Sequence, residues 1–83
     1  MHKVHLNEKP EHFLKKLDKN ERERIIKKLT LLETNPQLGK PLTGPLAGLW
    51  SLRIGDYRVI YQIKDKELII LVLKIGHRKN VYK

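Results

Sequence analysis

Cysteine is absent from this chain of 83 residues, which excludes a disulfide framework, a thiolate metal site and a cysteine nucleophile. Long apolar runs are also missing. The longest one, Leu68 to Leu73, is far shorter than the ~20 residues of a membrane-spanning helix. The N-terminal residues lack the apolar stretch and small-residue cleavage site of a secretory signal. We therefore expect a cytoplasmic protein with no membrane partner.

Acidic residues are scarce, since 9 Asp and Glu face 18 Lys and Arg and leave a formal charge of +9. The imbalance is greatest in the second half: residues 36–83 hold nine basic and three acidic side chains. Such an excess favours a phosphate polymer or an acidic protein as partner. With 40% hydrophobic residues, the chain has enough apolar side chains for one small core. A single domain over residues 1–83 is expected.

Two segments have apolar residues at helical spacing. Pro10 suits the first turn of a helix that continues through residues 11–17. A second helix is expected to begin at Asn20, a good N-cap whose amide Glu23 could reach. Its apolar stripe consists of Ile25, Leu29 and Leu32. The two segments predict a helix hairpin.

Strand patterns flank this hairpin. Residues 2–6 alternate in polarity and predict an edge strand, whereas residues 36–48, with three prolines and three glycines, predict a connector. Three further strands are expected at residues 49–54, 57–64 and 67–75, joined by two-residue hairpins at Gly55-Asp56 and Asp65-Lys66. The predicted fold is α+β, in the order β-α-α-β-β-β. The helix hairpin packs on one face of a small twisted antiparallel sheet.

Two-residue loops fix which residues lie opposite each other. Ile54 then faces Tyr57, Arg53 faces Arg58, and Lys64 faces Glu67; Ile60 faces Leu71. One face collects the apolar side chains, and we expect it to pack on the helices: Trp50, Leu52, Ile54, Tyr57, Val59, Tyr61, Ile63, Leu68, Ile70 and Val72.

The opposite face carries Ser51 and the facing pair of Arg53 and Arg58. Like charges opposite each other repel unless an anion lies between them, so the pair indicates a phosphate site. Beside it we expect an exposed apolar patch, a surface typical of partner binding, formed by Ile60, Ile69, Leu71 and Leu73. The segment after the last strand adds further candidates to the same site, namely His77, Arg78, Lys79 and Tyr82.

These side chains suit the cleavage of RNA without a metal or cofactor. RNA supplies its own nucleophile, the 2′-hydroxyl, so the protein need only align the backbone, move protons and stabilise the phosphorane. Arg53, Arg58 and Arg78 could grip the phosphate, while His77 or Tyr82 carries the proton. No carboxylates stand at a spacing that would predict a metal site.

The chain resembles the RelE/ParE superfamily of type II toxin–antitoxin toxins, most closely its RelE branch. The resemblance rests on the segment from Leu49 to Tyr61, on Gly76-His77-Arg78, and on Val81-Tyr82. It implies a microbial RNase fold with its active site on the helix-free face of the sheet. It also implies an endoribonuclease that cleaves mRNA on the ribosome and a RelB-like antitoxin that silences it in a hetero-oligomer.

The resemblance assigns phosphate binding to Arg58 and Arg78, and Arg78 is also a candidate to protonate the leaving oxygen. Tyr82 corresponds to a tyrosine that stacks on or orients the substrate. Arg53 falls near a lysine implicated as base or phosphate stabiliser, and Ser51 and Lys79 are further candidate substrate contacts. Because an arginine side chain is a poor proton acceptor, His77 is the better candidate for the base.

Two other hypotheses stay open at this point. One is a ParE-like toxin that inhibits DNA gyrase by binding, and the other is a non-catalytic RNA-binding module. The combination of Arg58, His77, Arg78 and Tyr82 favours the ribonuclease. For the antitoxin, the predicted apolar patch beside basic charge favours an acidic amphipathic helix or an added strand.

Overall fold

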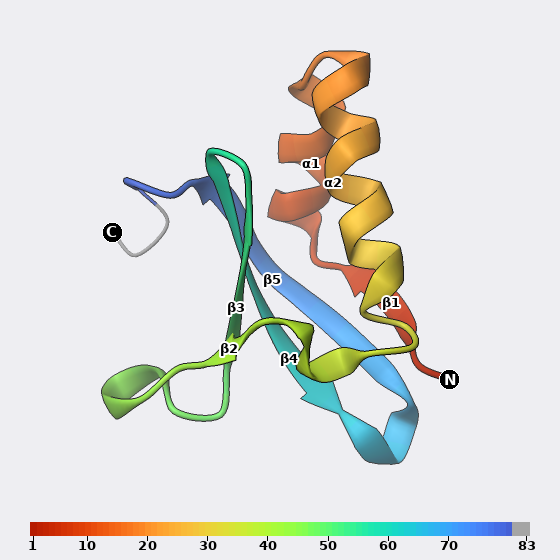
Figure 1. Cartoon of the computed structure of the whole chain (residues 1–83), viewed down its shortest axis with the longest axis vertical. Coiled ribbons are helices and arrows are strands. Elements are labelled where there is room, and N and C mark those ends of the chain that lie inside the picture. Colours follow the sequence, from red (N-terminus) through yellow and green to blue (C-terminus); the bar gives the residue numbers. More distant parts are fainter. Residues whose placement is uncertain (81–83) are drawn as a thin grey trace.

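The computed structural model describes residues 1–80, as two helices beside one five-stranded sheet (Figure 1). The helices are α1 (Glu8–Lys16) and α2 (Lys19–Leu31). The strands are β1 (Lys3–Leu6), β2 (Lys40–Pro41), β3 (Trp50–Ile54), β4 (Tyr57–Lys64) and β5 (Ile69–His77). They lie in the order β1-β5-β4-β3-β2, and no helix in residues 1–80 is long and apolar enough to cross a membrane.

The sheet is mixed, whereas a fully antiparallel sheet was predicted. β1 is an edge strand, as expected, but it runs parallel to β5, with Val4 opposite Ile70. β4 is antiparallel to both β3 and β5, so these two strands run in one direction, and the helices provide the crossover that a connection from β1 to parallel strands requires. The rest of the predicted α+β order is confirmed.

The helices begin and end close to the predicted positions. Pro10 and Leu14 are the buried residues of α1, and Ile25 and Leu29 are those of α2. The predicted cap at Asn20 is wrong. Asp18 caps α2 instead, because its carboxylate accepts a hydrogen bond of 2.9 Å from the Glu21 amide.

The core lies between the two helices and the facing side of the sheet, with Leu14 of α1 and Ile25 and Leu29 of α2 on the helix side. β3 contributes Leu52 and Ile54, β4 contributes Val59 and Tyr61, and Leu32 lies just beyond α2. The predicted core face is therefore confirmed for β3 and β4. Trp50 stacks on Tyr61 with ring centroids 6.3 Å apart, so both aromatic rings belong to the core as expected.

The long connector is anchored by the hydroxyl of Tyr61, a residue with no exposed surface. This hydroxyl donates to the Pro36 carbonyl at 2.8 Å and accepts from the Gly39 amide at 3.0 Å. The segment held in this way forms β2, which pairs with β3 and was not predicted. A strand of two residues is too short to leave an alternating pattern in the sequence.

The hairpin between β3 and β4 has the predicted register, with Arg53 opposite Arg58 and Ile54 opposite Tyr57. Gly55 makes this tight turn possible, because its φ of +59° lies in the left-handed region.

The predicted hairpin between β4 and β5 is wrong. Residues Asp65–Glu67 form a 3-10 turn, Leu68 has a left-handed φ of 56°, and Lys64 pairs with Ile69 rather than Glu67. Leu68 is consequently 52% exposed and not part of the core. Ile60 lies opposite Lys74 instead of Leu71, because the register shifts again between Ile60 and Tyr61.

We predict that Tyr61→Phe lowers the free energy of unfolding by about 1–3 kcal/mol, because the Gly39 amide loses its acceptor inside the protein. Urea denaturation at neutral pH measures the change. Burial also raises the pKa of Tyr61 above its ordinary value of 10.0. The unfolded hydroxyl then ionises first, so wild-type stability falls as pH rises through about 10. In Tyr61→Phe this loss of stability above pH 10 should be smaller. Equal free energies of unfolding for the two proteins, at neutral pH and above pH 10, would contradict this account.

Candidate nucleic-acid interface

The face of the sheet turned away from the helices carries the facing arginines. Residues opposite each other in a ladder share a face, and neighbours along a strand alternate. Since Val59 and Tyr61 face the core, Arg58 and Ile60 lie on the other face, together with Arg53 and Ser51. Arg53 is exposed and Arg58 is half-buried. The predicted cationic pair is thus present on the helix-free face.

Ser51 orients one of these arginines. Its side chain is only 5% exposed, and its hydroxyl accepts a hydrogen bond of 3.4 Å from Nη1 of Arg58. Arg53 is held at the turn, where its Nε donates to the Gly55 carbonyl at 3.4 Å. Ser51, a predicted substrate contact, is therefore nearly inaccessible and is hydrogen-bonded to Arg58.

Two cations of this face were missed by the sequence analysis. Lys40 of β2 lies opposite Ser51, and Lys74 of β5 lies opposite Ile60. Because Ser51 and Ile60 are themselves paired, the four residues form one row across four strands. Lys40 belonged to a segment predicted as a connector, and the predicted register gave Lys74 no place on this face.

Arg78 and Lys79 lie in the turn after β5 and are exposed. The backbone amide of Arg78 donates to the Asp56 carbonyl at 3.0 Å, which ties this turn to the one between β3 and β4. The predicted approach of Arg78 to the arginine pair is consistent with this bond. Tyr82 lies outside the described residues.

His77 lies on the other face of the sheet. It pairs with Tyr57, the neighbour of Arg58 along β4, and its ring is 5.3 Å from the Tyr57 ring. Tyr57 in turn meets Phe13 of α1 edge to face. Partial burial and the Glu21 carboxylate raise the pKa of Tyr57. The expected meeting of His77 with Arg58 is therefore absent from this arrangement, because adjacent strand residues point to opposite faces.

The predicted apolar patch is only partly exposed. Ile60 is 5% exposed, which contradicts the expectation, because a residue of a central strand has neighbours on both sides. Ile69 and Leu71 are half-buried on β5. Leu73 contributes to a hollow that it shares with Pro10 and Phe13 of α1, so the four residues do not form one open surface.

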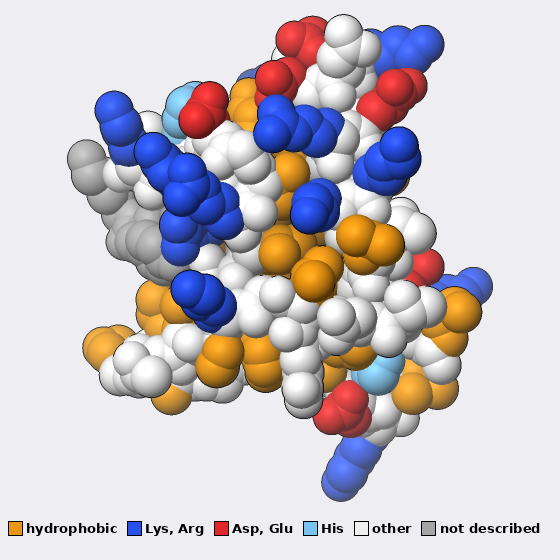
Figure 2. Space-filling model, viewed as in Figure 1, with side chains coloured by type: hydrophobic (Ala, Val, Ile, Leu, Met, Phe, Trp, Pro, Cys, Tyr) orange, Lys and Arg blue, Asp and Glu red, His pale blue; other side chains and the backbone are white. Residues whose placement is uncertain are grey.

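Lys and Arg side chains gather beside the β3–β4 hairpin and also over α2, while further cations are scattered around the edge of the view (Figure 2). Hydrophobic side chains are exposed between the hairpin and α2. Among residues 1–80, no three His, Cys, Asp or Glu residues are grouped so that they could hold a metal ion.

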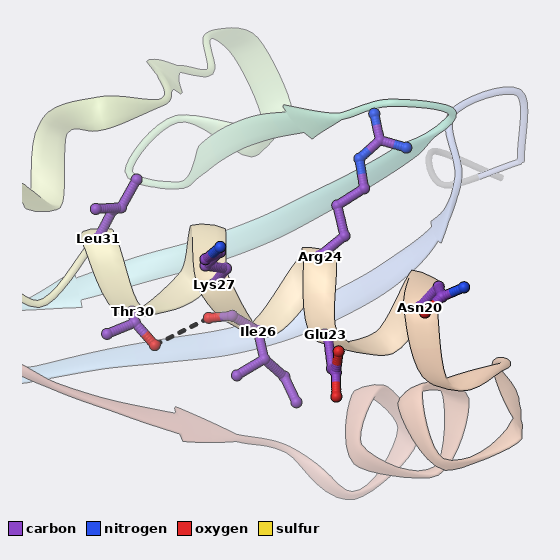
Figure 3. Close-up of a pocket in the computed structure, with 7 residues that line it drawn as sticks. All are labelled: Asn20, Glu23, Arg24, Ile26, Lys27, Thr30 and Leu31. Atoms are coloured by element: carbon purple, nitrogen blue, oxygen red, sulfur yellow. Dashed lines mark hydrogen bonds between the residues drawn. The ribbon is translucent and has the colours of Figure 1, made fainter.

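A hollow of about 740 Å³ follows the outer side of α2 (Figure 3). Two large apolar side chains line it: Ile26, which is 46% exposed, and Leu31, which is 49% exposed. Arg24 and Lys27 stand beside them, and Arg24 extends toward the β3–β4 hairpin, where an added Cβ at Gly55 would lie 2.8 Å from its guanidinium.

The sequence profile of the family described as ParE toxin of type II toxin–antitoxin system, parDE, matches residues 4–82. The chain belongs to this toxin family. Its fold is similar to that seen in the crystal structure of the toxin–antitoxin complex RelBE2 from Mycobacterium tuberculosis, with a TM-score of 0.84 and 30% identity over 93% of this chain and 98% of that one. The expected RelE/ParE resemblance and fold are confirmed.

Two curated proteins similar to this chain are also mycobacterial. Toxin RelG of M. tuberculosis is 40% identical over 47 residues, which are 57% of this chain and 54% of RelG. Toxin RelE of the same organism is 43% identical over 53 residues, which are 64% of this chain and 55% of RelE. The matched segments thus span about half the length of these relatives.

Repulsion between Arg53 and Arg58 should lower the free energy of unfolding at low ionic strength. We predict that Arg53→Gln raises the free energy of unfolding by up to about 1 kcal/mol in low salt, since it relieves the repulsion with Arg58. The gain should shrink when salt screens the charges. Urea denaturation at two salt concentrations measures it, with Lys66→Gln in the β4–β5 turn as the control. A loss of stability in Arg53→Gln at low salt would contradict the predicted repulsion.

Proposed function

We propose that this family toxin is an mRNA endoribonuclease that acts on the ribosome in the cytoplasm and thereby inhibits translation. The observation that carries the proposal is the pair of Arg53 and Arg58, held opposite each other on the helix-free face. Repulsion within the pair is relieved when a phosphate lies between the two guanidinium groups, and arginine binds phosphate oxygens with directed hydrogen bonds. The RelE toxins among its relatives support the same class of activity.

The proposed reaction needs no metal. The 2′-oxygen of the RNA attacks the adjacent phosphorus, the bond from phosphorus to the 5′-oxygen breaks, and the products are a cyclic phosphate and a 5′-hydroxyl. The 2′-hydroxyl gives its proton to a solvent water molecule, and the 5′-oxygen receives one from Arg78, which regains it from solvent after the bond has broken. The phosphorane gains negative charge between these events, so fixed cations stabilise it more than they stabilise the substrate.

We assign each arginine a different role in this proposed reaction. Arg58, oriented by Ser51, binds the scissile phosphate, while the exposed Arg53 holds the neighbouring backbone. Arg78, tied to the turn at Asp56, protonates the leaving oxygen, and Lys79 adds charge for the RNA strand. Tyr82 remains proposed to stack on the substrate. His77 packs on Tyr57 away from Arg58, so we propose that it supports the hairpin rather than takes the proton.

A cognate antitoxin is the proposed partner. The RelBE2 structure is described as a toxin–antitoxin complex, which supports such a partner for this chain. Because Ile60 is buried, we propose that the antitoxin contacts the outer side of α2, where Ile26 and Leu31 lie beside Arg24 and Lys27. Ile69 and Leu71, on the other face of the sheet, remain proposed as a separate antitoxin contact. An acidic amphipathic segment matches both the apolar and the cationic side chains.

Cleavage on the ribosome tests the ribonuclease. In a purified translation system, primer extension should show discrete cuts with the wild type. Arg58→Ala should lower the cleavage rate by about 100-fold or more, because one fixed donor to the phosphorane is lost. His77→Ala should retain most of the activity, since its ring lies on the other face.

Other outcomes assign other functions. Intact mRNA together with gyrase inhibition would replace this proposal by the ParE-like alternative. The matching family is itself described as a ParE toxin family, so this alternative is tested alongside. RNA binding without any product would leave the non-catalytic module.

The antitoxin surface can be separated from the RNA surface by substitution. We predict that Ile26→Asp with Leu31→Asp weakens binding of the cognate antitoxin by at least about 10-fold, because acidic charge replaces two exposed apolar contacts. Calorimetric titration measures the affinity, and mRNA cleavage should persist. Glu23→Gln, on the same side of α2, is the control and should bind normally. Unchanged affinity in the double variant would place the interface elsewhere.

A further inference from the structure

β5 contains a β-bulge beside the arginine pair. Tyr61 pairs with Val72, but Ile60, the residue before Tyr61, pairs with Lys74. Ile60 and Tyr61 are consecutive on β4, whereas their partners Lys74 and Val72 are two residues apart on β5. Leu73, the extra residue, has no partner of its own on β4. Bulges of this kind re-aim side chains and are over-represented next to active sites.

The bulge decides which residue of β5 stands opposite Ile60. Without it, a continuous ladder from Tyr61 and Val72 would pair Ile60 with Leu73 and would give this position an apolar side chain. With it, the position holds Lys74. The next pair along the ladder is regular on the far side of the bulge, with Val59 opposite the core residue Ile75.

Lys74 and Arg58 are diagonal neighbours on the helix-free face. Arg58 pairs with Gly76, and Lys74 lies two residues before Gly76 on β5. Diagonal partners of an antiparallel pair lie about 7–8 Å apart, which long side chains can bridge with a small anion between them. Gly76 has no side chain, so β5 places nothing of its own opposite Arg58. Lys74 is also exposed, as a residue that contacts a substrate must be.

We propose that Lys74 binds the RNA phosphate together with Arg58; this inference rests on the proposed ribonuclease function. The Lys74 ammonium donates hydrogen bonds to a non-bridging oxygen of the scissile phosphate. It neutralises charge as the bond from the 2′-oxygen to phosphorus forms and the bond to the 5′-oxygen breaks. No proton passes to or from Lys74, because a fixed positive charge is what the phosphorane requires.

Single-turnover cleavage of ribosome-bound mRNA tests this role with three variants. Lys74→Gln should slow cleavage by about 10-fold or more, and Lys74→Arg should stay within about threefold of wild type, because both lysine and arginine supply a cation. Lys66→Gln, an exposed cation in the β4–β5 turn, is the matched control and should be unaffected. Urea denaturation confirms that each variant is folded.

Two results would overturn the inference. If Lys74→Gln cleaves as fast as Lys66→Gln, Lys74 has no part in the reaction. If Lys74→Arg is as slow as Lys74→Gln although both are folded, a proton-transfer role replaces the phosphate contact.

A binding measurement keeps Lys74 testable if the wild type fails to cleave. A fluorescent single-stranded RNA oligonucleotide is titrated with wild type, Lys74→Gln and Lys66→Gln over a range of salt concentrations. Loss of one phosphate contact should lower the slope of log affinity against log salt by roughly 1 in Lys74→Gln alone. An unchanged slope would overturn the contact. Absence of cleavage with the expected slope change would reject the ribonuclease and retain the RNA contact.

Discussion

The two faces of β4 are the constraint on which the whole molecule depends. This strand lies between β3 and β5, so side chains on each of its faces have neighbours from both adjacent strands. Alternation sends Val59 and Tyr61 into the core and Arg58 and Ile60 to the helix-free face. A shift of β4 by one residue would bury the arginine and expose the core residues. The hydrophobic effect that fixes β4 in its register therefore also fixes the position of Arg58, the charge proposed to bind phosphate.

Repulsion on the helix-free face is tolerated because the core fixes it there. Arg53 and Arg58 lie in the same row, and Lys40 and Lys74 lie in the next. Each like-charge neighbour costs a fraction of a kcal/mol, far less than burial of a side chain such as Tyr61 contributes. A phosphate bound there, as proposed, would meet charges that the sheet already holds in place, so binding would cost less order than with flexible side chains. One face of the sheet thus supplies stability, and the opposite face carries the charges proposed to bind RNA.

The sequence could predict those parts of the fold that local chemistry determines. Gly55 adopts the left-handed conformation of a tight turn, and its presence fixed the register of Arg53 and Arg58 correctly. Leu68 has the same conformation without being glycine, which is uncommon, so the β4–β5 loop was predicted two residues too short. The bulge at Leu73 carries no composition signal either. Lys74 was missed, and His77 was expected beside Arg58. Beyond the bulge, the face on which a β5 residue lies follows from the strand pairing of the structure, which the sequence pattern does not reveal.

The most direct test of the central claim, that RNA binds the helix-free face of the sheet, is an NMR titration of the ¹⁵N-labelled chain with a short single-stranded RNA. The account predicts amide shift changes in a contiguous set on β2 to β5 and the turn after them: Lys40, Ser51, Arg58, Lys74 and Arg78. The outer side of α2, including Ile26 and Leu31, should be unaffected. Changes centred on α2, with an undisturbed sheet face, would contradict the account.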